Sequence, residues 1–248
     1  MKAFVLFPIL LLSIPAVNAA TLIEREDSQM GSSKMWVDGN NMRAQVDNGS
    51  YMLMNFKRKQ MYIVNTPRRE IIDASEMMKN RPAAAGLKVE IKRSGKGPVI
   101  AGYSTQKYDL MVNGRRCEQS LVSMKALKDS GLVDMMESMG DIDFDPRGDA
   151  YKSPCDKADG IFAIRMKKIG LPLAEINERG QVVDKVLRIE KNSKLPAGGF
   201  KRPSGYRTVT MQQMMQNSFG GGMPPAELMQ NMTPEQKRMM EQMMRESR

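Results

Sequence analysis

The residues that carry chemistry in most enzymes are sparse in this chain, and one type is missing. None of the 248 residues is a histidine. This absence excludes Ser-His-Asp and Cys-His nucleophiles, zinc hydrolase sites built on histidine, and histidine as a general base. Pairs of carboxylates remain possible in principle, but no two are marked by their neighbours as a catalytic couple. We therefore expect a protein that is not an enzyme and that holds no resident cofactor.

Two cysteines, Cys117 and Cys155, are the only thiols in the chain. In an oxidising compartment their default state is a disulfide. The bond would close a loop of 38 residues (155 − 117) and would stabilise the fold by about 4 kcal/mol on chain-entropy grounds. A redox or metal-thiolate site is the alternative, but the close Cys-x-x-Cys spacing typical of such sites is absent. The sequence favours the structural disulfide.

Methionine is abundant, with 25 copies, and it is dense in a C-terminal tail at 211–248. The tail contains a Gly- and Pro-rich break. The letters TPEQ at 233–236 form a capping box with proline at the first helical position, which predicts an amphipathic helix at 234–246. At 100° per residue, four methionines share one face of this helix. They are Met239, Met240, Met243 and Met244.

We consider three uses for this methionine face. It packs on the domain or on a second copy of the chain, since methionine fills irregular apolar surfaces well. It binds a peptide or lipid as a pliable apolar surface. It supplies thioether ligands to Cu(I) or Ag(I), because soft metals select sulfur. The candidate ligands for the soft metal are Met211, Met214, Met215, Met239 and Met243.

The N-terminus predicts export. Lys2 precedes an apolar run at 3–16, and the small residues at 17–19 suit a signal peptidase, so we expect residues 1–19 to be a cleaved signal peptide. The run is shorter than the roughly 20 apolar residues that a membrane-spanning helix needs, and it contains two prolines. We therefore expect no transmembrane span and a periplasmic location.

The chain carries a formal net charge of +10. Because we expect the protein to be exported, we do not expect its positive charge to bind nucleic acid. The basic residues fall in short groups, such as those at 57–59 and 201–202. At turns, such groups are typical of solvated edges, and attraction to anionic lipid headgroups or to an acidic partner is the alternative.

The elements that hold these residues are predicted to be short antiparallel strands. At 50–56, Met52, Met54 and Phe56 alternate with a second set of side chains. This period of two places one face on a core and the other toward water. The first strands are expected near 34–38, 42–46, 50–56, 60–65 and 69–73.

Turn chemistry and one helical pattern complete the domain. The hairpin dipeptides are DG at 38–39, NG at 48–49 and at 113–114, and RG at 179–180. An apolar stripe predicts a helix at 124–139. Phe200 and Tyr206 flank a Pro-Ser-Gly turn and are expected to pin the end of the domain to the sheet. We predict an α+β domain at 20–210, built on an antiparallel sheet.

Several short pieces of the chain carry a family resemblance. They are Met61-Tyr62-Ile63-Val64, Gly102-Tyr103 with Lys107-Tyr108, and Phe200 with Pro203, Gly205 and Tyr206. With its hairpins in this order, the segment 21–210 resembles the periplasmic family known as domain of unknown function 4412. That family commonly places a cysteine before the Asn-Gly turn, whereas Cys117 follows it here.

The family is similar to the lipoprotein-localisation carriers of the LolA and LolB type. Their fold is a strongly curved antiparallel half-barrel, closed by helices over an apolar cavity. The resemblance implies a half-barrel here, with helices packed on its concave face. The residues expected to line the cavity are Met52, Met54, Phe56, Met135, Met136 and Met139. For each of them, simple core packing is the alternative.

The expected function is that of a non-enzymatic periplasmic binding protein or carrier for an apolar ligand or a lipidated partner. Two alternatives stay open. One is an envelope protein that handles Cu(I) or Ag(I) through its methionines. The other is a chaperone-like interaction protein that acts, or self-associates, through its C-terminal helix.

Overall fold

The structure, a computed structural model, describes residues 19–29, 31–45, 49–78, 87–139, 153–155, 158, 167–211 and 213–214. The strands in this part of the chain are β1 (Ala19–Asp27), β2 (Gly31–Asp38), β3 (Asn41–Gln45), β4 (Ser50–Asn55), β5 (Gln60–Asn65), β6 (Glu70–Asp73), β7 (Val89–Lys96), β8 (Gln106–Val112), β9 (Arg115–Ser123), β10 (Leu171–Asn177), β11 (Val182–Lys194) and β12 (Arg207–Thr210). The helices that lie wholly within the described residues are the 3₁₀ helix η1 (Ser75–Met78), α1 (Met124–Ser130) and α2 (Leu132–Met139).

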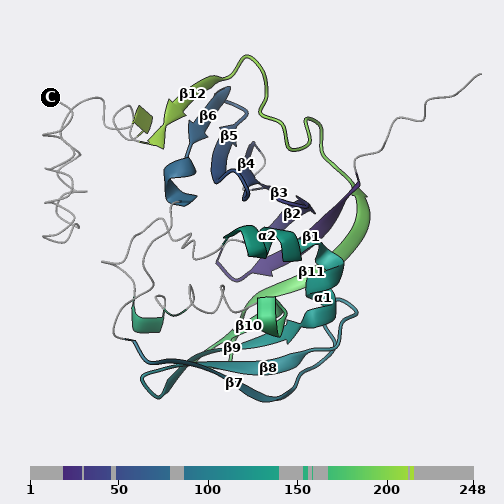
Figure 1. Ribbon diagram of the computed structural model, residues 1–248, viewed down its shortest axis with the longest axis vertical. Coiled ribbons are helices and arrows are strands. Elements are labelled where there is room, and N and C mark those ends of the chain that lie inside the picture. The colour runs from purple at the N-terminus through teal and green to yellow at the C-terminus, as the bar shows by residue number, and fades with distance from the viewer. Residues whose placement is uncertain are drawn as a thin grey trace, which may run out of the picture.

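The described strands form one sheet of 12 strands, which is open and curved (Figure 1). Their order is β12-β6-β5-β4-β3-β2-β1-β11-β10-β9-β8-β7. Neighbouring strands in it are antiparallel, apart from the parallel pair β6 and β12. The prediction of a curved antiparallel sheet is confirmed, and the fold is mostly sheet with few helices.

The predicted meander and three of its tight turns are also confirmed, while the predicted turn at 48–49 lies partly outside the described residues. Strands β2 to β6 pair in sequence order. In the β8–β9 turn, Asn113 and Gly114 both have positive φ angles, 50° and 84°, as a two-residue hairpin requires. Gly39 and Gly180 have positive φ in the other two of these turns. These dipeptides set which strands become neighbours.

The predicted helix at 124–139 is present, but its description as one helix was wrong. Ser123 caps α1 by accepting a hydrogen bond from the backbone N–H of Ala126 at 3.3 Å. Gly131 then adopts the left-handed conformation, with φ of 72°, and ends α1 before α2 begins. A glycine in this conformation is a helix terminator, so the apolar stripe continues on two short helices.

The helices lie on the inner side of the curve, where Figure 1 shows α1 and α2 between the two ends of the sheet. Ala126 and Leu127 of α1 belong to the same apolar cluster as Ile23 of β1 and Leu173 of β10. None of the described helices is long and apolar enough to cross a bilayer.

The outer face of β2 to β6 is more buried than expected. The prediction that this face is turned toward water was wrong. Leu53, Val64 and Ile71 are buried on that face. They are covered by residues 195–206, which we call the strap. Its Tyr206 packs against this cluster, and its Phe200 packs against a second cluster that contains Trp36. The expectation that Phe200 and Tyr206 pin the end of the domain to the sheet is confirmed.

The predicted disulfide between Cys117 and Cys155 is present, with the two Cα atoms 5.5 Å apart. It ties residues 153–155 to β9. The predicted signal peptide, apart from Ala19, and the tail helix at 234–246 lie outside the described residues.

Candidate functional site

The inner face of the sheet carries an apolar cluster that is rich in methionine. We call these methionines the methionine core. Its buried members are Met42, Met54, Met61, Met78, Met135 and Met136, and its partly buried members are Met35, Met52, Met77 and Met211. They come from strands, from η1, from α2 and from the residue that follows β12.

Strand register places the sheet methionines in contact. Met42, Met54 and Met61 lie directly opposite one another across β3, β4 and β5. Directly paired residues on one face of a sheet have Cβ atoms roughly 5 Å apart. The three side chains therefore form a continuous row. Met52 lies in the next row, opposite Ala44 and Ile63.

The covering helices add methionines from the other side. Met135 and Met136 of α2 are buried in the same cluster, and so is Met78 of η1. A methionine side chain is unbranched and flexible, so it fills irregular space and adapts to a change in its neighbours. The inner core is thus lined by adaptable side chains on both the sheet and the helix side.

The structure brings together five of the six predicted cavity residues. Met54, Phe56, Met135 and Met136 are buried in one cluster, and Met52 packs against it. At these positions the side chains fill the space between the sheet and α2. Met139 ends α2, and its side chain lies outside the described residues.

The predicted soft-metal ligands are described only in part. Met211 packs against the methionine core, and Met214 is partly exposed. Met215, Met239 and Met243 lie outside the described residues. The described part of the chain has no cluster of histidine, cysteine and carboxylate ligands that could hold a metal ion.

A pair of glutamates was missed by reasoning from sequence. Glu118 on β9 and Glu175 on β10 both have a raised pKa, and burial is the largest cause for each. The pKa of Glu118 reaches about 7, with the charge of Glu175 as the second cause. Ser120 donates a hydrogen bond of 3.2 Å to Glu118, which opposes the shift. The two strands pair in regular register here, with Glu175 opposite Ser120 and Asn177 opposite Glu118. They are far apart in sequence, so sequence spacing did not place the two carboxylates together.

Arg43 is the second residue whose role was missed. It is 6% exposed on the outer face, opposite Trp36 and Leu53 in the neighbouring strands. Its guanidinium donates hydrogen bonds of 2.9 Å to two carbonyls of the strap, those of Ala197 and Gly199.

The same guanidinium lies 3.8 Å from the centre of the Tyr51 ring. Burial lowers the pKa of Arg43 and raises the pKa of Tyr51. The arginine therefore fastens the strap to the sheet through carbonyl oxygens and an aromatic ring.

Comparison with known proteins gives a distant likeness and no family. No family model matches the chain, so the resemblance to domain of unknown function 4412 gains no support from that comparison. No curated protein matches it either.

Among solved structures, the chain is similar to MucB at 9% identity, with a TM-score of 0.36, over 78% of this chain and 60% of MucB. A complex of MucA and MucB from Pseudomonas aeruginosa aligns at 10% identity and a TM-score of 0.33, over 79% of this chain and 60% of the matched chain. MucB in complex with MucA(peri) aligns at 10% identity and a TM-score of 0.34, over 79% of this chain and 58% of the matched chain. The chain thus spans about 60% of the length of the MucB chains that it matches. At these TM-scores the likeness assigns no function, which has to be argued from the residues of this chain.

Proposed function

We propose that this protein is exported to the periplasm and binds an apolar group there, an acyl chain or the lipid of a lipidated partner, without catalysing a reaction. The observation that carries the proposal is the methionine core, in which the row Met42, Met54 and Met61 faces Met135 and Met136. A core that only had to be stable would favour branched aliphatic side chains, because methionine specifies a single packing poorly. Methionines on both the sheet side and the helix side favour a core whose packing can rearrange to admit a ligand.

Helix α2 is the element that the ligand would displace. It has eight residues, and a helix of this length depends on packing for its stability. Gly131, in its left-handed conformation, separates it from α1 and supplies a hinge. Movement of α2 about Gly131 would withdraw Met135 and Met136 and open the inner face to an acyl chain.

The free energies of apolar burial favour this exchange. Exposing two methionine side chains costs about 1.5–3 kcal/mol each, whereas burying about ten methylene groups contributes about 0.8 kcal/mol each, or roughly 8 kcal/mol. An acyl chain therefore offsets the lost contacts of α2 and leaves a surplus for binding. A short or polar ligand buries too little apolar surface to offset the lost contacts of α2.

The test is uptake of a fluorescent long-chain fatty acid by the delipidated mature protein, with native mass spectrometry for lipid that copurifies. Met136→Ala weakens the packing of α2, and we expect it to lower stability by about 2–4 kcal/mol. It should also raise acyl affinity about tenfold, since displacing α2 then costs less.

The matched control is Leu110→Ala, which removes a buried side chain from a separate cluster on the other side of the sheet. It should lower stability by a similar amount and leave acyl affinity unchanged. A wild-type protein that takes up no fatty acid and carries no lipid contradicts the proposal. So does an equal effect of the two substitutions on affinity.

A further inference from the structure

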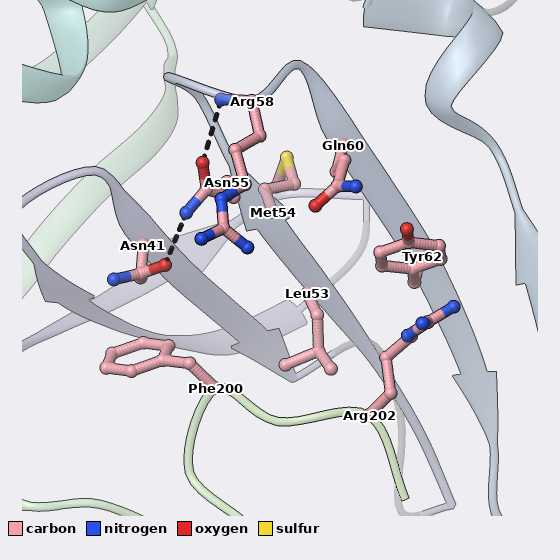
Figure 2. A pocket seen from close by; sticks show the side chains of 9 residues that line it. All are labelled: Asn41, Leu53, Met54, Asn55, Arg58, Gln60, Tyr62, Phe200 and Arg202. Carbon is pink, nitrogen blue, oxygen red and sulfur yellow. Dashed lines mark hydrogen bonds between the residues drawn. The ribbon is translucent and has the colours of Figure 1, made fainter.

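The outer face of the sheet holds a pocket of about 250 Å³ between β3 to β5 and the strap. Figure 2 shows the side chains that line it. Met54 belongs both to this lining and to the methionine core, while the other lining residues lie outside that core. The pocket therefore lies on the face of the sheet opposite the proposed acyl site and shares only Met54 with the methionine core.

One side of the pocket is apolar and aromatic. Leu53 and Tyr62 are directly paired on β4 and β5, and Phe200 of the strap approaches from the opposite side. The Arg202 guanidinium lies over the Tyr62 ring at 4.7 Å from its centre (Figure 2). A flat organic group has aromatic surface to pack on here, because Tyr62 and Phe200 are only half-buried.

The other side is polar and held in place by hydrogen bonds. The side-chain carbonyl of Asn55 accepts a 2.8 Å hydrogen bond from the backbone N–H of Arg58, and its amide donates a 2.7 Å bond to the side-chain oxygen of Asn41. Both ends of the Asn55 amide are thus engaged. This arrangement fixes the β4–β5 turn, from which the Arg58 side chain reaches toward the pocket (Figure 2).

The charge of the pocket has one sign. Two arginines, Arg58 and Arg202, line it, and no carboxylate does. Among the described residues, neither guanidinium forms a salt bridge. Arg43, buried on the adjoining strand opposite Leu53, adds a third positive charge that is held by carbonyls and an aromatic ring. A concave site lined by one sign of charge attracts the opposite sign.

We infer that this pocket binds an oxyanion, phosphate or carboxylate, carried on a small organic body that packs against Tyr62 and Phe200. Guanidinium groups match the geometry of both anions with paired N–H donors. The volume of about 250 Å³ is near the lower end, roughly 300 Å³, of pockets that hold small molecules. The ligand is consequently small, with one charged end and one flat or apolar end.

The test is titration of the full mature protein with phenyl phosphate, with benzoate as the carboxylate probe and phenol as the neutral match. Trp36 is the single tryptophan of the chain and packs in the same cluster as Phe200, so its fluorescence reports on the pocket. Calorimetry gives an independent Kd. We expect Arg58→Gln and Arg202→Gln each to weaken binding of the anionic probes about tenfold or more.

Arg179→Gln is the matched control, since it removes the same charge from an exposed residue in the β10–β11 turn and should leave the Kd unchanged. Vesicles of phosphatidylglycerol, compared with phosphatidylcholine, distinguish a lipid headgroup from a free ligand. Binding that depends on Arg58 and Arg202 supports the site. If the protein binds the phosphatidylglycerol vesicles in this way, the anion is a lipid headgroup; if it binds only the soluble probes, the anion belongs to a free small molecule. Equal loss in all three arginine variants, or no loss in the two pocket variants, overturns the inference.

Discussion

The carboxyl group of Glu118 is half-buried on β9, and its charge is coupled to that of Glu175 on β10. Burial, followed by the charge of Glu175, raises its pKa to about 7. In the unfolded chain the same group has its usual pKa of 4.5. Between these two values the folded protein binds more protons than the unfolded chain, so the free energy of unfolding falls as the pH rises.

The size of the effect follows from the two pKa values. The interval from 4.5 to about 7 corresponds to roughly 3 kcal/mol at about 1.4 kcal/mol per pH unit. Because solvent reaches part of the side chain, we expect about 2 kcal/mol to be lost between pH 4.5 and 7. Glu118→Gln keeps the shape of the side chain and removes the ionisation. The variant should match the wild type near pH 4.5 and exceed its stability by about 2 kcal/mol near pH 8.

The measurement is urea unfolding followed by circular dichroism at several pH values, with the disulfide intact. The difference in unfolding free energy between Glu118→Gln and wild type cancels the groups that titrate alike in both proteins and leaves Glu118 with its coupling to Glu175. Glu137→Gln, which makes the same substitution at an exposed carboxyl group on α2, is the control for the loss of one negative charge. If the difference for Glu118→Gln is independent of pH, or if it grows toward acid, the burial argument is refuted.

Three further substitutions test the framework. Cys117→Ser opens the loop of 38 residues and should lower the unfolding free energy by about 4 kcal/mol in urea, whereas adding reductant to that variant should change nothing more. Arg43→Leu leaves two strap carbonyls without their donor, so we expect a loss of about 2–4 kcal/mol and faster hydrogen exchange or proteolysis at 195–206. Arg188→Leu, on an exposed arginine of β11, should leave the strap protected. Gly131→Ala forces a side chain into a left-handed conformation and should lower the melting temperature, with a cost of about 1 kcal/mol.

The parts of the fold that could be predicted depend on neighbours along the chain. The alternation of Met52, Met54 and Phe56 identified the inner face of β4, and Asn113-Gly114 located a hairpin, because both signals are local. The disulfide followed from two cysteines in a chain whose N-terminus predicts export. The grouping of residues 52, 54, 135 and 136 is not a local signal; it followed from the resemblance to the lipoprotein-localisation carriers, which implies helices on the concave face.

The parts that could not be predicted depend on contacts between distant segments. Leu53 and Val64 are covered by the strap, which lies more than a hundred residues further along the chain, and no period in β4 or β5 signals that cover. The arginine that fastens the strap looks from sequence like any polar residue on a solvated face. The break at Gly131 was visible as a glycine, but whether it bends a helix or ends it depends on its φ angle.

The two faces of β2 to β6 are built for opposite purposes. On the outer face, a buried arginine, aromatic rings and the strap hold the strands through directional contacts, which have few alternative arrangements. On the inner face, flexible methionines pack against a short helix that begins just after a glycine hinge. Because directional contacts resist rearrangement and methionine contacts tolerate it, a ligand that enters the inner face should find a rigid sheet and a movable cover. Under the proposed function, the strap thus stabilises the sheet against which the methionine core would rearrange to admit a ligand.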